Sequence, residues 1–276
     1  MDSLVSTDWL AQHLDDVDLV VVDASWHMPA TGRKGEEEYR RAHIRGARFL
    51  DIDAVSGREN PAPHMLPSPA EFARAMEALG VGSDDRIVVY DNSPLRTAAR
   101  GWFMLRHFGA AEVAILDGGL QKWVAEGRPT ETGDPAPPPA SFAVRERADV
   151  VDKAAILAGT GNMLVDARGA GRFTGDEPEP RPGLASGHIP GSRNIPYAAI
   201  YRENGSFRSP DELRSIFAAA GVDPSAPFVA TCGSGVSANS LIFAAHLIVN
   251  DRALLYDGSW SEYGADPATP KAVGPA

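Results

Sequence analysis

Short apolar runs recur along the chain, and helical patterns separate them. Runs typical of buried strands occupy residues 19–22, 87–90, 113–116, 163–165, 228–231 and 253–256. Amphipathic helical patterns occupy residues 7–14, 69–79, 97–108, 210–220 and 236–249. Alternating strands and helices predict an α/β fold with a mainly parallel sheet that helices cover on both faces. Such sheets bind ligands beyond the carboxyl ends of their strands.

The pattern of the first half returns in the second. Residues 68–81 and 209–222 both begin with Ser-Pro, carry glutamate three positions after the serine, and end with Gly-Val. Serine as N-cap, proline at the first helical position, glutamate in a capping box and a terminal glycine together define a helix. Three more pairs of segments match at nearly the same offset: 22–24 with 165–167, 42–48 with 187–193, and 116–119 with 256–259.

A proline-rich segment separates the two halves. Residues 127–140 include five prolines, a composition that favours an extended linker over a helix or a central strand. We therefore expect an N-terminal domain at 1–126, a linker at 127–148 and a C-terminal domain at 149–276. Each domain is expected to be a mainly parallel sheet flanked by helices, so that the chain is a tandem repeat.

The only cysteine, Cys232, stands where an apolar run meets the turn Gly233-Ser234-Gly235 and a helical pattern follows. The glycines allow a tight turn, and the mouth of a helix stabilises negative charge on sulfur through backbone N–H groups. A lone cysteine is more often a small buried hydrophobe, but a core cysteine has no need of adjacent glycines. The position therefore favours a nucleophile. In the first half Asp91 occupies the aligned position, so that half lacks one.

Composition narrows the classes of partner. A net charge of −11 argues against nucleic acid and anionic membranes as partners. No apolar run approaches the length of a membrane span, and no signal peptide is visible. One cysteine excludes an internal disulfide and suits a reducing cytoplasm. Seven scattered histidines show no zinc-ligand spacing, so we expect no metal. We also expect that the protein needs no cofactor and is a monomer.

Taken together, these segments resemble the two-domain sulfurtransferases of the rhodanese superfamily. The resemblance is carried by residues 23–26, 43–47, 51–53, 116–119, 166–168, 187–191 and the cysteine loop. It implies two rhodanese-like domains and transfer of sulfane sulfur through a Cys232 persulfide. Thiosulfate sulfurtransferases typically carry Cys-Arg-Lys-Gly-Val-Thr in this loop, whereas 3-mercaptopyruvate sulfurtransferases carry Cys-Gly-Ser-Gly-Val-Thr. This chain is closest to the second pattern and departs from it only at Ser237.

The resemblance also implies substrate-binding roles. Arg172 and Arg181 would hold the carboxylate and keto oxygen of 3-mercaptopyruvate, since guanidinium forks suit a planar α-keto acid. The alternative is that both are solvated arginines in a polar loop. The outer sulfur of the persulfide is expected to lie against loop amides, namely those of Gly233, Ser234, Gly235, Val236 and Ser237.

Proton transfer is assigned to Ser234. It would protonate the departing pyruvate enolate, alone or through His43 or water. No acidic partner of His43 is identified. By contrast, Arg168 is interpreted as structural, beside an acidic partner, and His188 as a packing and hydrogen-bonding residue.

The sulfur acceptor stays open: a thiol, thioredoxin or cyanide would each accept sulfur from the persulfide. Thiosulfate as the small-molecule sulfur donor is the nearest alternative function. A cysteine phosphatase needs arginine six positions after its cysteine, and that position is Ala238. A non-enzymatic rhodanese-like binding module commonly loses the cysteine, which this chain retains.

Overall fold

Residues 1–275 of the computed structural model are described here, and they form two compact units. Unit 1 contains Met1–Gly57, Leu66–Ala148 and Glu203–Phe207. Unit 2 contains Arg58–Met65, Asp149–Arg202 and the chain from Arg208 onward. The domain limits drawn on the sequence stay a prediction, and they did not anticipate that Arg58–Met65 packs with the second unit. Within residues 1–275 no helix is long and apolar enough to cross a bilayer.

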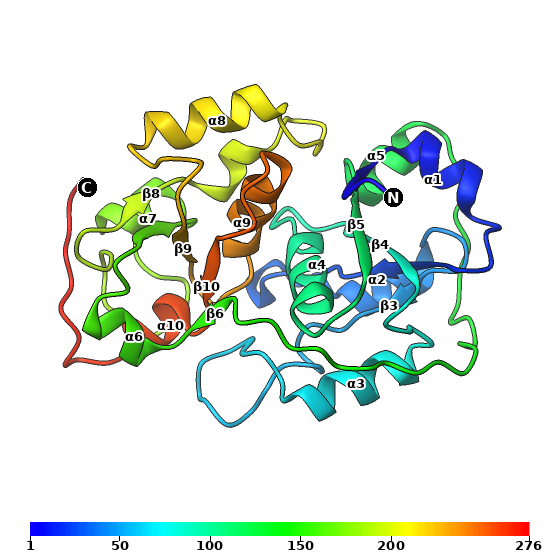
Figure 1. Ribbon diagram of the computed structural model, residues 1–276, viewed down its shortest axis with the longest axis horizontal. Helices are drawn as coiled ribbons and strands as arrows, with labels where there is room; N and C mark the ends of the chain where they lie inside the picture. Colours follow the sequence, from blue (N-terminus) through cyan, green and yellow to red (C-terminus); the bar gives the residue numbers. More distant parts are fainter. Residues whose placement is uncertain (276) are drawn as a thin grey trace. The chain divides into compact units, whose positions relative to one another are not determined.

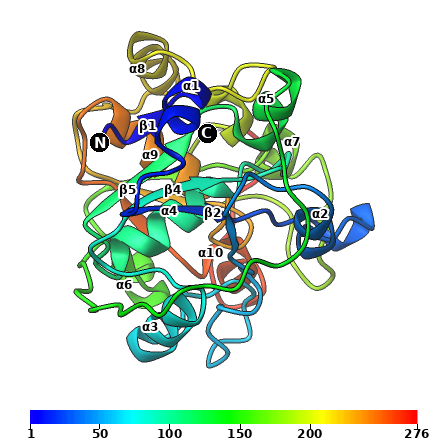
Figure 2. The same ribbon diagram turned by 90° about the vertical axis from the view of Figure 1, so that its right-hand side faces the viewer.

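Unit 1 is built on a five-stranded sheet of order β1-β5-β4-β2-β3, in which every neighbouring pair is parallel. The strands are β1 (Leu4–Val5), β2 (Leu19–Asp23), β3 (Arg48–Phe49), β4 (Arg86–Tyr90) and β5 (Glu112–Leu116). The helices are α1 (Thr7–His13), η1 (Pro29–Thr31), α2 (Gly35–Arg41), α3 (Pro69–Ala78), α4 (Ala98–His107) and α5 (Gly119–Ala125). Figure 2 shows α1 and α5 on one side of this sheet and α3 and α4 on the other.

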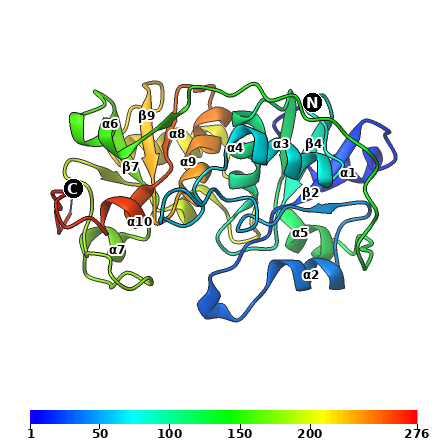
Figure 3. The same ribbon diagram turned by 90° about the horizontal axis from the view of Figure 1, so that it is seen from below.

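Unit 2 repeats the architecture with the order β6-β10-β9-β7-β8, again parallel throughout. The strands are β6 (Val150–Val151), β7 (Met163–Asp166), β8 (Arg193–Asn194), β9 (Phe228–Thr231) and β10 (Leu254–Tyr256). The helices are α6 (Lys153–Ala158), α7 (Ala170–Thr174), η2 (Tyr197–Ile200), α8 (Pro210–Ala219), α9 (Ala238–Leu247) and α10 (Ser259–Tyr263). Helices α8 and α9 lie on one side of the sheet, and α6 and α10 lie on the other (Figures 1 and 3).

The predicted α/β fold of two tandem units, each a parallel sheet flanked by helices, is confirmed. The six apolar runs form the central strands of both sheets because Val, Ile and Leu at consecutive positions suit strands that are buried on both faces. Both Ser-Pro helices have the expected capping box, with Ser68 and Ser209 each accepting the N–H of the glutamate three positions on. The outer strands β1, β3, β6 and β8 were not predicted, since two residues are too few to make a pattern.

The two sheets differ in the charge buried at their carboxyl ends. Asp166 at the end of β7 is paired with Arg168, whereas the matching Asp23 at the end of β2 has Ser25 two positions on. The Ser25 N–H donates to the Asp23 carboxylate at 2.9 Å. Burial nevertheless raises the pKa of Asp23 to about 7, because removal from water disfavours its charged form more than the hydrogen bonds favour it.

This difference predicts how stability depends on pH. Between the unfolded pKa of about 4 and the folded value of about 7, the unfolded chain releases the Asp23 proton while the folded protein keeps it. The contribution of Asp23 to the free energy of unfolding is therefore fully present below about pH 4 and falls as the pH rises to about 7. Asp23→Asn removes this loss, so the variant should gain about 2–3 kcal/mol over wild type between pH 5 and pH 8.

Urea unfolding at both pH values measures the effect. The exposed position 84 supplies a matched control, because Asp84→Asn changes the same chemical group outside the core. Equal pH dependence in Asp23→Asn and wild type would contradict the assignment.

Candidate active site

Cys232 lies at the carboxyl end of β9, in the turn that leads into α9, and is 1% exposed. The turn depends on Gly235, whose φ of +71° is in the left-handed region. A Cβ on Gly235 would also lie only 2.6 Å from the Asp257 carbonyl oxygen. Both constraints exclude a larger residue. The short apolar strand and this glycine together hold Cys232 in the turn that precedes α9.

Ser259 holds both ends of the cysteine turn. Its hydroxyl accepts the N–H of Cys232 and the N–H of Gly235, each at 3.1 Å, and donates to the Tyr256 carbonyl at 2.9 Å. Ser259 has a φ of +50°, and its counterpart in unit 1 is Gly119 with a φ of +59°. A left-handed conformation costs a non-glycine residue about 1–2 kcal/mol. Unit 2 therefore carries strain at the position where the hydroxyl secures the turn.

Four amides of the turn have no acceptor within the described residues: those of Gly233, Ser234, Val236 and Ser237. Successive N–H groups in a turn at a helix N-terminus form an anion site. The Gly235 amide was expected to belong to this group, but it donates to Ser259. We therefore limit the proposed sulfur cradle to the other four and give Gly235 a conformational role.

Unit 1 has a carboxyl group at the position of the cysteine. The Asp91 carboxylate accepts the Ser93 N–H at 2.8 Å and the Ala98 N–H at 2.7 Å. Asp91 is buried and aligns with Cys232. Of its two amide donors, Ser93 aligns with Ser234 of the proposed cradle. Burial raises the pKa of the Asp91 carboxyl group.

The histidine that the structure brings to Ser234 is His64. Its Nδ1 lies 2.9 Å from the Ser234 Oγ, and both side chains are buried. His64 belongs to the segment Arg58–Met65 of unit 2 and has a φ of +63°. Strained backbone at a histidine that contacts a reactive loop is typical of a functional site. Sequence reasoning did not select His64, which is 170 positions from its partner and lies in no periodic pattern.

His43, the histidine expected to act with Ser234, has a different environment. It is fully buried in unit 1, its ring stacks on Tyr39 at 4.1 Å, and its Nδ1 lies 2.8 Å from the Tyr39 carbonyl oxygen. His188 does the same in unit 2, where it stacks on Phe173 at 3.9 Å and its Nδ1 lies 2.8 Å from the Phe173 carbonyl oxygen. Because both repeats use this histidine for packing, we correct the proposed relay from His43 to His64.

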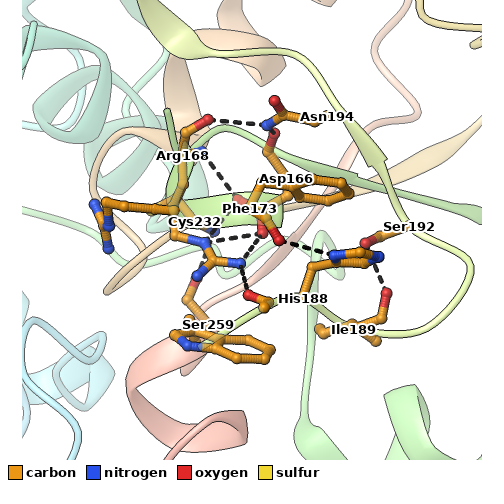
Figure 4. Close-up of polar contacts among 12 residues, drawn as sticks. Asp166, Arg168, Phe173, His188, Ile189, Ser192, Asn194, Cys232 and Ser259 are labelled. Carbon is orange, nitrogen blue, oxygen red and sulfur yellow. Dashed lines mark hydrogen bonds and ion pairs between the residues drawn. The ribbon is translucent and has the colours of Figure 1, made fainter. Parts of the chain in front are cut away.

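Arg168 is the centre of a buried ion network, as expected of a structural residue (Figure 4). It contacts Asp166 at 2.6 Å and Glu179 at 2.7 Å, and its guanidinium lies 4.5 Å from the centre of the Trp260 ring. Burial alone would lower the pKa of Arg168, but the two carboxylates outweigh burial and raise it. The network fixes the start of α7.

Arg172 lies on α7 rather than in a polar loop. Its guanidinium forms two hydrogen bonds with Glu179, at 2.6 and 3.2 Å, and Glu179 is itself nearly inaccessible. A Cβ built on Gly233 would lie 3.0 Å from the Arg172 Nη2. Because Gly233 has no side chain, the Arg172 guanidinium can lie beside it. Glu179 holds this partly exposed cation in place next to the residue that follows Cys232. Arg181 lines a nearby cavity of about 730 Å³.

The same arrangement recurs in known proteins. The model of the rhodanese-like domain matches residues 6–126 and again residues 150–266. The chain belongs to the rhodanese family. Its two rhodanese-like domains account for the duplicated sheet and for the cysteine turn at the end of the middle strand of the second sheet.

Individual members of the rhodanese family are similar over nearly the whole chain. The 3-mercaptopyruvate sulfurtransferase of Escherichia coli (strain K12) is 42% identical over 95% of this chain and 94% of its own length. A thiosulfate sulfurtransferase of Cricetulus griseus is 41% identical over 95% of this chain and 91% of its own. The crystal structure of the 3-mercaptopyruvate sulfotransferase SseA from Escherichia coli aligns with a TM-score of 0.86 and 39% identity, covering 95% of this chain and all of that one. Because relatives with either donor name are 41–42% identical to this chain, the donor must be argued from the site.

Proposed function

We propose that the protein is a sulfurtransferase that moves sulfur from 3-mercaptopyruvate to a nucleophilic acceptor through a Cys232 persulfide and releases pyruvate. The observation that carries the proposal is the set of four amides around Cys232 that have no acceptor in the described chain. A persulfide places an anionic sulfur one bond beyond Sγ, where such a cradle is needed.

The first half-reaction breaks a carbon–sulfur bond. The Cys232 thiolate attacks the sulfur of 3-mercaptopyruvate, and the electrons of the broken bond go to carbon as pyruvate enolate. The Ser234 hydroxyl donates a proton to that carbon and recovers one from His64 at Nδ1. His64 in turn takes up the proton that the donor thiol releases as its sulfur becomes the anionic outer sulfur, so no net proton is consumed. The outer sulfur remains on Cys232.

The arginines orient the donor. We assign the donor carboxylate to Arg172, which Glu179 holds beside Gly233, and the keto oxygen to Arg181. A guanidinium fixed by a buried carboxylate loses little freedom when it binds an anion, and this favours a productive geometry.

In the second half-reaction, a thiol, thioredoxin or cyanide attacks the outer sulfur and releases Cys232. Two half-reactions on one sulfur imply ping-pong kinetics. We further propose a cytoplasmic monomer, since a single reactive cysteine suits a reducing compartment. No cofactor enters either half-reaction.

The donor preference follows from where the cations lie. Thiosulfate carries two negative charges close to the transferred sulfur, and binding them calls for cationic side chains in the loop itself. This loop offers Gly233 and Ser234, whereas Arg172 and Arg181 lie outside it and suit a single, more remote carboxylate. We expect kcat/KM to be about 100-fold or more higher for 3-mercaptopyruvate than for thiosulfate, the scale of one or two lost charge-assisted contacts.

Side-by-side kinetics with the two donors and cyanide as acceptor measure this ratio, with pyruvate and sulfite as the respective products. Equal use of both donors would support a thiosulfate sulfurtransferase and reject the argument from loop charge. Absence of pyruvate release would reject the proposed function.

A further inference from the structure

The four amides of the proposed sulfur cradle are oriented from the carbonyl side of their peptides. A trans peptide is planar, so the carbonyl of one residue and the N–H of the next point in opposite directions, and fixing one fixes the other. The cradle amides belong to peptides whose carbonyls are those of residues 232, 233, 235 and 236. Each of these four carbonyls accepts a hydrogen bond from a residue of unit 2.

The start of α10 holds two of these carbonyls. The Trp260 N–H donates to the Cys232 carbonyl at 3.0 Å. The N–H and the hydroxyl of Ser261 donate to the Gly233 carbonyl at 2.8 and 2.6 Å. The contact at the cysteine belongs to the fold itself, because the Leu120 N–H makes the same contact at 3.0 Å with the aligned carbonyl in unit 1.

A single side chain, that of Asn239, holds the other two carbonyls. Its Nδ2 donates to the Gly235 carbonyl at 2.6 Å and to the Val236 carbonyl at 2.9 Å. Because both partners are acceptors, the amide group must present its nitrogen to them. Its oxygen is then buried without a hydrogen-bond partner in the described chain, which costs about 1–3 kcal/mol. The fold tolerates this cost at a fully buried residue, the second of α9.

Two N–H groups on one short side chain distinguish asparagine at this position. A serine there could donate only one hydrogen bond to a carbonyl three or four positions earlier, and leucine could donate none. The second residue of α4, the matching helix of unit 1, is Ala99. Of the two repeats, the one that carries Cys232 therefore also carries the double donor.

We propose that Asn239 is a positioning residue for sulfur transfer, which aims the Val236 and Ser237 amides at the outer sulfur before that sulfur arrives. The inference rests on the proposed function. The transferred sulfur becomes anionic as the persulfide forms, and donors that are already oriented stabilise such charge without reorganising during the reaction. Asn239 acts through the two peptides that it holds.

Single-turnover kinetics test the proposal, with pyruvate release and sulfur loading by intact mass as readouts. Asn239→Leu removes both donors and keeps a side chain of similar size, and Asn239→Ser keeps one donor. At saturating 3-mercaptopyruvate we expect the rate constant to fall about tenfold in Asn239→Leu and about threefold in Asn239→Ser. These losses are smaller than the roughly 10²–10³-fold that follows removal of a donor, because both amides remain in the chain. The donor KM should stay within about twofold of wild type, since its carboxylate is assigned to Arg172.

Asn250 supplies a matched control for loss of stability. It is a second buried asparagine of unit 2, just beyond the end of α9 that is remote from the cysteine turn. Its Nδ2 likewise donates to two carbonyls, those of Pro224 at 3.0 Å and Ala226 at 2.8 Å. Asn250→Leu should lower the free energy of unfolding as Asn239→Leu does. Its single-turnover rate constant should stay within about twofold of wild type, because a first-order constant does not depend on the amount of folded protein.

The outcomes separate the positioning role from the proposed function. An unchanged rate constant in Asn239→Leu, or an equal loss in Asn239→Leu and Asn250→Leu, would overturn the positioning role. So would a rate constant for Asn239→Ser no higher than that for Asn239→Leu. If Asn239→Leu does not fold, Asn239→Ser decides alone against Asn250→Ser, and equal rate constants in these two would overturn the role. Wild type that neither releases pyruvate nor gains sulfur would instead reject the proposed function.

Discussion

Cys232→Ser is expected to abolish sulfur transfer while the protein stays folded. The turn is held by Gly235 and by the Ser259 hydroxyl, which bonds the backbone rather than the thiol. The chemistry, in contrast, needs a thiolate that can carry a second sulfur. The rate with 3-mercaptopyruvate should fall on the order of 10⁴-fold or more, as when a nucleophile is removed from a covalent mechanism.

Intact-mass measurement after treatment with the donor decides this prediction. Wild type should gain the mass of one sulfur atom and lose it when cyanide is added, and Cys232→Ser should gain nothing. Because Cys232 is the only cysteine, no other thiol can take up the label. A sulfur adduct on the variant, or residual transfer, would exclude Cys232 as the sulfur carrier. Cys232→Ala provides a second variant without a hydroxyl.

His64→Asn is expected to slow the reaction with 3-mercaptopyruvate by about 10²–10³-fold, the range of general acid–base catalysis. Asparagine tolerates the left-handed backbone at this position, so the change tests the imidazole with little added strain. Sulfur loading from thiosulfate should be much less affected, since sulfite leaves without a proton being delivered to carbon. The readouts are the rate of pyruvate release and the rate of persulfide formation from each donor.

An equal loss with both donors would indicate that His64 only supports the turn. An unchanged kcat would remove it from the mechanism. His246→Gln is the control, because His246 lies near the end of α9 and its Nδ1 contacts Asp251.

Much of the fold could be predicted because its signals are local. A buried run such as residues 87–90 predicts a strand without any information on the strands beside it. The serine, proline and glutamate that begin α3 likewise act within one helical turn. The two-residue strands were missed, and so were the helices of five to seven residues α2, α5, α6, α7 and α10. Their stability comes from neighbouring strands and side chains, which leave no periodic trace in so short a segment.

The site was predictable only in part, for the same reason. The glycines beside Cys232 predict a turn, but no local pattern predicts that His64 contacts Ser234. The role of Ser259 did leave a signal. In the comparison of residues 116–119 with 256–259, serine replaces a glycine that has positive φ in the other repeat. A residue that replaces glycine at such a position is a candidate for a specific hydrogen-bonding role.

The Asp91 carboxylate gives the two units different relationships to the catalytic cycle. In unit 1 the amides of Ser93 and Ala98 are always occupied by the Asp91 carboxyl group, which belongs to the chain itself. In unit 2 the four amides of the cysteine turn are expected to gain the outer sulfur as a partner only while Cys232 carries sulfur. Because hydrogen bonds between these amides and the outer sulfur form only in the folded turn, they should raise the free energy of unfolding of unit 2 during that part of the cycle. Each turnover would then alternate between a more stable, sulfur-loaded enzyme and a less stable, sulfur-free enzyme. The acceptor, by removing the sulfur, would return the protein to the less stable form.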